Sequence, residues 1–257
     1  MKYTNMQKGI FVSRPNRFIA HVSISAGEDK EEIVVCHVKN TGRCKELLLP
    51  GVTVLVQFHP EAAALGRKTW YSLIGVLKER EDGPLLINMD SQAPNLATFE
   101  WLTENMNFLP LPCDRGLTRD GRHGFTIETL KREVTYDQSR FDLAFKASDP
   151  SFSAFMEVKG VTLEEQGLAM FPDAPTERGI KHVDELIRAH KEGYESYLMF
   201  VIQMKGIRAF KPNIVTHPEF AKALLRADKE GVHLLAYDCI ITEDSMTLDQ
   251  PVPILLE

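Results

Sequence analysis

An aspartate and a glutamate separated by fourteen residues, with a lysine two positions after the glutamate, form the pattern in this chain with the clearest chemical use. Asp142 lies in SRFDLAF, and Glu157 and Lys159 lie in FMEVKGV. Both segments alternate as strands do, so Glu157 and Lys159 share one face. The intervening KASDPSFS has the Ser, Asp and Pro typical of a turn. A hairpin centred on Asp149 and Pro150 would place Asp142 opposite Glu157.

Two carboxylates and a lysine on adjacent strands suit phosphodiester hydrolysis. Two acids at close range cannot both stay ionised without a compensating cation, and oxygen ligands on a rigid sheet favour Mg²⁺ or Mn²⁺ over zinc. Lys159 could orient the attacking water or neutralise charge that develops in the transition state. Glu-x-Lys alone is common, so an exposed strand acid beside an ordinary surface pair is the alternative explanation.

A second polar cluster occurs at the start of a predicted helix in MFPDAPTERGIKHVDEL. Thr176 is the N-cap candidate, and the spacing of Arg178, His182 and Glu185 puts them on one helix face. Helix N-termini attract anions, so we expect Arg178 and His182 to bind phosphate. No second His or Cys stands at ligand spacing, which makes His182 a binding or orienting group rather than a metal ligand. The alternative is a solvated face with i,i+4 pairs.

The elements that would position these residues fall into two groups. The first eighty or so residues are strand-like runs separated by turn signals, which favours a small closed barrel of the OB type. From about Leu86 the pattern becomes mixed, with strands and helices in the order of an α/β sheet covered by helices. We therefore predict domains at residues 1–85 and 86–257. The predicted helices are APNLATFEWLTENM, TERGIKHVDELIRAHKEG and PEFAKALLRADKEG, and the predicted late strands are YLMFVIQM and VHLLAYDCIIT.

Composition narrows the class of protein. The 257 residues are 44% hydrophobic and 26% charged, which is ordinary for a globular protein. No apolar run has the length of a membrane span and no signal peptide is evident, so we expect a cytoplasmic protein without a membrane partner. The four cysteines form no CxxC and indicate reduced, structural thiols. A net charge of −6 means that nucleic-acid binding must rest on local patches.

Several short segments together resemble one known family, the sugar fermentation stimulation protein A (SfsA) family. They are RPNRF, NTGR with LLLPG, SQAPN, SRFDLAF, MEVKGVTL, FPDAPTERGIKHVDEL and GIRAFKPN, in the family's order and nearly end to end. The resemblance implies an OB-fold amino-terminal domain followed by a PD-(D/E)XK, restriction-endonuclease-like domain with a mixed sheet. It also implies sequence-nonspecific DNA binding and a link to sugar utilisation.

The resemblance assigns roles to individual residues. Asp142, Glu157 and Lys159 take the places of the two acidic metal ligands and the lysine of the nuclease motif, and Glu100 is a candidate fourth acid. The chain departs from the family pattern at Leu96, where a basic residue is usual, and at Cys44, where methionine is common. The predicted nucleic-acid contacts are Arg14, Arg17, Asn40, Arg43, Arg140, Arg178 and His182.

Three functions remain open at this point. The first is an Mg²⁺- or Mn²⁺-dependent nuclease acting on DNA or RNA. The second is a DNA-binding regulator of sugar (maltose-type) metabolism that keeps the nuclease shape without turnover. The third is a small-molecule phosphoesterase, which would need a closed pocket with polar recognition groups. The oligomeric state stays open.

Overall fold

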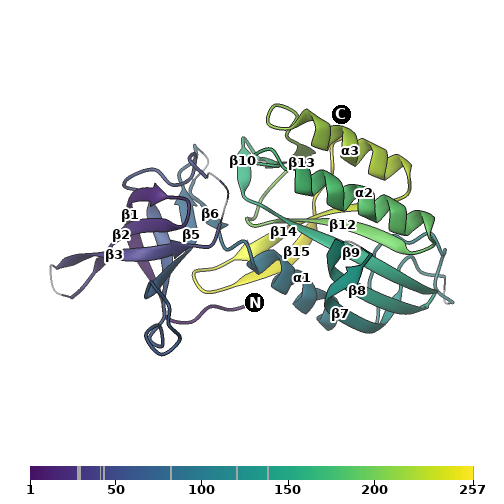
Figure 1. Cartoon of the computed structure of the whole chain (residues 1–257), viewed down its shortest axis with the longest axis horizontal. Helices are drawn as coiled ribbons and strands as arrows, with labels where there is room; N and C mark the ends of the chain where they lie inside the picture. The colour runs from purple at the N-terminus through teal and green to yellow at the C-terminus, as the bar shows by residue number, and fades with distance from the viewer. Residues whose placement is uncertain are drawn as a thin grey trace.

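The computed structural model of the chain has two domains joined end to end (Figure 1). It describes residues 1–27, 30–40, 42, 44–81, 83–119, 121–137 and 139–256. The first domain is a β-barrel, and the second is a mixed sheet flanked by helices. In the described ranges, no helix has the length and apolar character that crossing a membrane requires.

Five strands close the barrel. In chain order they are β1 (Met6–Asn16), β2 (Ile19–Ser25), β3 (Glu31–Val38), β4 (Thr53–Phe58) and β5 (Tyr71–Lys78). The order is β3-β2-β1-β4-β5, and parallel pairing of Cys36–Val38 with Tyr71–Leu73 joins the two edges. Alternate residues of β2 are buried, as expected for strands that fill a small barrel with one face. Barrel closure removes the open edges that isolated strands would leave.

A short strand, β6 (Leu85–Asn88), extends the barrel sheet by pairing with β5. The predicted domain boundary after residue 85 therefore falls at the first residue of this strand. Asn88 lies at the junction, where the Gln203 amide donates to its side chain and to its carbonyl. Nearby, Lys78 of β5 pairs with the buried Glu164 of the second domain at 2.6 Å. These contacts hold the two domains together.

The second domain is built on a six-stranded mixed sheet. Its strands are β7 (Thr126–Tyr136), β8 (Ser139–Asp149), β9 (Ser151–Val161), β12 (Glu195–Ile202), β14 (His233–Ile241) and β15 (Met246–Pro251), in the order β15-β14-β12-β9-β8-β7. The central strands β9, β12 and β14 run parallel, while β7, β8 and β15 are antiparallel to their neighbours. All eight residues of β12 are buried, which confirms the continuous apolar run as a strand covered on both faces.

Three helices cover this sheet, with α2 (Glu177–Lys191) and α3 (Pro218–Lys229) on one face and α1 (Ala93–Glu104) on the other (Figure 1). Alternate residues of β12 divide between the two cores: Leu198 packs with α2 and α3, and Met199 packs with α1. The predicted N-cap of α2 is confirmed, because Thr176 Oγ1 accepts from Gly179 N at 2.9 Å. A small sheet of β10 (Leu163–Glu165), β11 (Leu168–Phe171) and β13 (Ala209–Pro212) lies toward the barrel.

The fold confirms the main predicted elements and adds others. The run FVSRPNRFIAHVSI proves to be two strands, β1 and β2, that turn at Arg17 and Phe18. The basic residues between Arg115 and Arg132 lead into β7. The short strands β6, β10, β11 and β13, together with β7 and β15, were not predicted. The four cysteines are free, as expected.

Candidate active site

Asp142 lies where strands β8 and β9 begin to separate. The hairpin register runs from Ser148 opposite Ser151 to Leu143 opposite Met156, so its next step brings Asp142 opposite Glu157, as the sequence predicted. Backbone pairing of β8 with β9 ends at Leu143. From there the Asp142 side chain takes the place of a backbone acceptor, because its Oδ2 accepts from Val158 N at 2.8 Å. Asn95 Nδ2, from the first turn of α1, donates to Oδ1 at 2.6 Å. Asp142 is thus held by both neighbouring elements.

Glu157 lies in the middle of β9 and is almost completely buried. Its Oε1 accepts from Lys159 Nζ at 2.6 Å and forms a very short contact with His182 Nδ1. Helix α2 supplies His182, because the packing of that helix on β9 and β12 turns this face toward the sheet. The structure therefore joins Glu157, Lys159 and His182 into one network.

Glu157 Oε2 is the exception in this network. Within the described part of the chain, this buried oxygen has no hydrogen-bond partner. A buried carboxylate oxygen without a donor costs free energy, so this oxygen is available to a group that the chain does not supply. Oxygens of Asp142 and Glu157 are the ligand type that Mg²⁺ and Mn²⁺ prefer. The donor set at this site therefore fits a divalent cation.

The pKa shifts of Asp142 and Glu157 also favour a divalent cation at this site. Burial, followed by the charge of Glu157, raises the pKa of the Asp142 carboxyl above its usual value. Burial also opposes ionisation of Glu157, but the His182 hydrogen bond and the Lys159 ammonium outweigh it and lower the pKa of Glu157. Glu157 is thus the more readily ionised member, and Asp142 is ionised against a penalty. A divalent cation between them would remove that penalty.

Arg178 completes the cluster from the first turn of α2. Its Nε donates to His182 Nε2 at 3.3 Å, so the helix face predicted from spacing does bring Arg178 and His182 together. Glu185 does not join them, because its carboxylate pairs with Arg188 at 2.6 Å. The structure places His182 against a carboxylate and a lysine rather than alone on the surface.

Two predicted residues lie apart from this network. Glu100 of α1 pairs with the amino group of Met1 at 2.6 Å. Arg140 of β8 is exposed and lies 3.6 Å from Glu133 of β7. Neither residue has a described contact with Asp142 or Glu157.

The predicted barrel residues lie on one side of the first domain. Arg14 has a structural task, since its guanidinium donates to the carbonyls of Arg17, Asn40 and Gly42 at 2.8, 3.0 and 3.1 Å. Arg17 is exposed and stacks over the Phe18 ring at 4.6 Å. The remaining predicted residue, Arg43, lies outside the described residues.

A pocket of about 520 Å³ opens beside these barrel residues. Its cationic lining residues are Arg14, Arg17 and Lys45, and Ala174 reaches it from the second domain. Ala174 is four positions before Arg178, so an extended segment between them covers at most about 14 Å. The positively charged pocket and the Glu157 site therefore lie near the two ends of one short segment.

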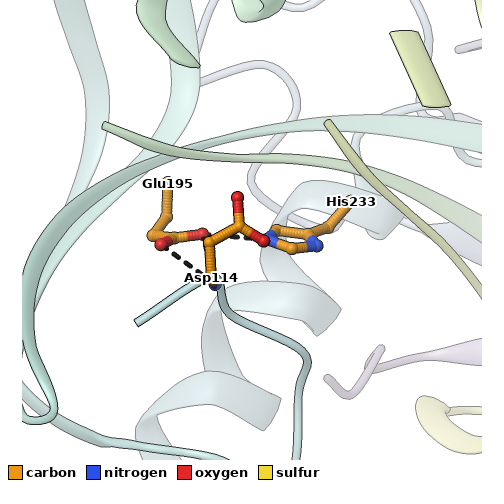
Figure 2. Close-up of side chains that lie close together, drawn as sticks. All are labelled: Asp114, Glu195 and His233. Carbon is orange, nitrogen blue, oxygen red and sulfur yellow. Dashed lines mark hydrogen bonds and ion pairs between the residues drawn. The ribbon is translucent and has the colours of Figure 1, made fainter. Parts of the chain in front are cut away.

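A second acidic cluster, which the sequence did not predict, lies at the amino ends of β12 and β14. Ligand atoms of Asp114, Glu195 and His233 lie within 4.8 Å of one another, so this group could hold a divalent metal ion. Figure 2 shows Asp114 and His233 placed against the Glu195 carboxylate. His233 Nε2 lies 2.8 Å from Glu195 Oε2, and Arg115 Nε lies 3.3 Å from Oε1.

Donors from the chain surround Glu195 on both oxygens. Besides His233 and Arg115, the Asp114 backbone N–H contacts both oxygens at 3.1 and 3.2 Å. Burial opposes ionisation of Glu195, but the bonds from His233 and Asp114 N outweigh it and lower the pKa. The members are widely separated in sequence, so no local spacing could have revealed this cluster.

Comparisons with known proteins agree with both domains. Residues 12–86 match the SfsA N-terminal OB domain, and residues 114–245 match the sugar fermentation stimulation protein RE domain. A sugar fermentation stimulation protein homolog from Desulfitobacterium hafniense (strain Y51) is 53% identical over 96% of this chain and 94% of its own length. One from Clostridium beijerinckii is 46% identical, with 100% of each chain covered.

A solved structure shares the whole architecture. The structure of Pyrococcus furiosus SfsA in complex with Ca²⁺ superposes with a TM-score of 0.76 at 25% identity, over 99% of this chain and 98% of that one. The barrel, the restriction-endonuclease-like sheet and the relatives at 46–53% identity lead to one conclusion. The chain belongs to the sugar fermentation stimulation protein (SfsA) family.

Proposed function

We propose that this protein is a divalent-metal-dependent nuclease that hydrolyses phosphodiester bonds in nucleic acid, with Asp142 and Glu157 as metal ligands. The observation that carries the proposal is the buried Oε2 of Glu157, which has no donor among the described residues and lies opposite Asp142, whose pKa is raised by burial and by Glu157. Hydrogen-bond donors and a lysine surround these acids on their other sides. The Ca²⁺ in the Pyrococcus furiosus relative supports a site for a hard, oxygen-preferring cation in this family.

The residues of the chain have separate tasks in this proposal. A bound Mg²⁺ or Mn²⁺ would polarise the phosphoryl oxygen and acidify water. Asp142 is held in place by Asn95 and by Val158 N. Lys159 keeps its ammonium beside Glu157, where it can neutralise charge that develops in the transition state. Arg178 offers further N–H donors to a phosphate at the start of α2.

The barrel would hold the polynucleotide. The pocket lined by Arg14, Arg17 and Lys45 provides local positive charge on a protein whose net charge is −6, which is what phosphate binding needs. Its other wall, at Ala174, belongs to the segment that leads into α2. A strand bound at this pocket would therefore be guided toward the acidic site.

Cleavage of single- and double-stranded DNA and RNA in Mg²⁺, Mn²⁺ or EDTA tests the proposal. The parent protein should cut at least one substrate only with metal, and Glu157→Gln should stop cutting while retaining binding. Salt-sensitive binding without cutting in any metal would instead favour a non-catalytic DNA-binding protein. Turnover of small sugar phosphates without cutting of polynucleotide would favour a phosphoesterase.

A further inference from the structure

The hydrogen bonds around His182 fix which of its ring nitrogens accepts and which donates. Arg178 Nε–H can only donate, so His182 Nε2, at 3.3 Å, must be the acceptor. In a neutral imidazole the proton then lies on Nδ1. Nδ1–H faces Glu157 Oε1 and donates to it.

This arrangement also gives the two carboxylate oxygens of Glu157 different surroundings. Lys159 Nζ is a donor as well, so its 3.3 Å approach to His182 Nδ1 is a contact between two donors that share the acceptor Oε1. Oε1 therefore receives both hydrogen bonds, while the buried Oε2 receives none from the described residues. The carboxylate cannot rotate without losing both bonds.

We propose that His182 is a positioning residue: its Nδ1–H fixes Oε1 of Glu157 and so leaves Oε2 available for the metal ion. This inference rests on the proposed metal site and adds a role for a residue outside the Asp142, Glu157 and Lys159 trio. Groups that orient a metal-ligating side chain typically contribute 10–100-fold to metal affinity. His182 itself, with Nδ1 on Glu157 and Nε2 on Arg178, has no nitrogen left for the metal.

Two substitutions with side chains of similar shape distinguish the effect of the His182 hydrogen bond from the effect of its packing. His182→Asn places an amide N–H near the position of Nδ1, whereas His182→Leu has the same branching and no donor. A matched control is His190→Leu, on the same helix, because His190 lies 3.5 Å from the carboxylate of Asp114 and has no described contact with Glu157. Melting in EDTA shows whether each full-length variant is folded.

The test is Mn²⁺ titration by calorimetry, without nucleic acid. We expect His182→Leu to bind Mn²⁺ about 10–100-fold more weakly, and His182→Asn and His190→Leu to bind within about threefold of the parent. Parent-like binding by His182→Leu, or equal losses in the Asn and Leu variants, overturns the role of His182. A parent that binds no Mn²⁺ overturns the metal site as well, whereas a parent that binds Mn²⁺ but cuts nothing refutes only the nuclease activity.

A spectroscopic measurement stays informative if His182→Leu fails to fold. Long-range ¹H–¹⁵N spectra of the parent protein distinguish the two neutral imidazole forms. The inference expects the Nδ1–H form for His182. An Nε2–H form contradicts it.

Discussion

The second domain contains two clusters of carboxylates and histidines, and they differ in how their central glutamate is satisfied. Glu195 receives donors on both oxygens from His233, Arg115 and the Asp114 backbone. Glu157 receives two donors on one oxygen and, within the described residues, none on the other.

The difference distinguishes an ion-paired cluster at Glu195 from the cluster at Glu157 that we propose as the metal site. At Glu195 the chain supplies its own cation, and the neighbouring loop is tied to the strand ends as a result. At Glu157 the second acid, Asp142, has a pKa raised first by burial and then by the charge of Glu157, so its ionisation carries a penalty. Proximity of ligand atoms alone would favour the Asp114, Glu195 and His233 cluster. Among the described residues, the hydrogen-bond donors around each glutamate instead favour a metal ion at Glu157, because its Oε2 has no donor.

The largest expected effect is on cleavage. Glu157→Gln removes the charge that holds the metal, so we expect a loss of about a thousandfold or more in the rate of metal-dependent cutting. Glu195→Gln should cut within about threefold of the parent at a temperature where both are folded. Equal losses in the two variants would break the distinction between the clusters.

Lys159→Ala should lower the cleavage rate about a hundredfold, because a cation beside the reacting group is removed. Metal affinity should not fall with the cleavage rate. Without a neighbouring positive charge, Glu157 and Asp142 should bind Mn²⁺ at least as tightly as they do in the parent protein. Rates and Mn²⁺ titrations on the same preparation measure both effects. Weaker Mn²⁺ binding in this variant would mean that Lys159 only holds the site together.

Glu195→Gln should lower the free energy of unfolding by about 1–2 kcal/mol, because Arg115 and His233 lose an ionised partner. The pKa of Glu195 is lowered in the folded protein, so its contribution exists above its usual value of 4.5 and disappears as the pH falls below it. The difference between parent and variant in denaturant unfolding should therefore close in acid. A constant difference at all pH values argues against the ion pair.

Reversing charge at the barrel pocket should weaken nucleic-acid binding without changing the chemistry at the acidic site. Arg17→Glu with Lys45→Glu should weaken nucleic-acid binding about tenfold and reduce its salt dependence. The same charge change at the exposed Lys68 and Lys229 is the control. Hydrolysis of a small activated phosphodiester should remain unchanged, which separates this surface from the acidic site.

The smallest effect is a gain in stability. Because the folded protein raises the pKa of Asp142, ionisation of this group destabilises the fold as the pH rises above the usual value of 3.8. Asp142→Asn should therefore melt slightly higher than the parent at neutral pH in EDTA, with no gain in strong acid. Glu195→Gln should change the melting temperature in the opposite direction. A lower melting temperature for Asp142→Asn at neutral pH would contradict this ionisation penalty.

The sequence predicted those parts of the fold that are coded locally. The hairpin of Asp142 and Glu157 followed from alternation and from the Asp149-Pro150 turn, and its register is as expected. Helix α2 was evident from its apolar stripe and from Thr176 as its cap. Strand β7 was missed because it is polar and mostly exposed along its length, as befits an edge strand that depends on β8 for its partners.

The site contacts depend on tertiary packing, and the sequence could show only part of them. Spacing placed Arg178 and His182 on one helix face, but it could not show that this face docks on Glu157, 25 positions away in the chain. The Asp114, Glu195 and His233 cluster joins three separate segments and has no local pattern. Arg14 is used by the turn carbonyls, a task that its charge alone could not reveal.

The most direct test of the central claim is the anomalous difference density of a crystal of the parent protein soaked in Mn²⁺. The account predicts a peak within ligand distance of Asp142 and of Glu157 Oε2, and none within ligand distance of Glu195. A peak bound by Asp114, Glu195 and His233 with nothing at Glu157 would contradict it.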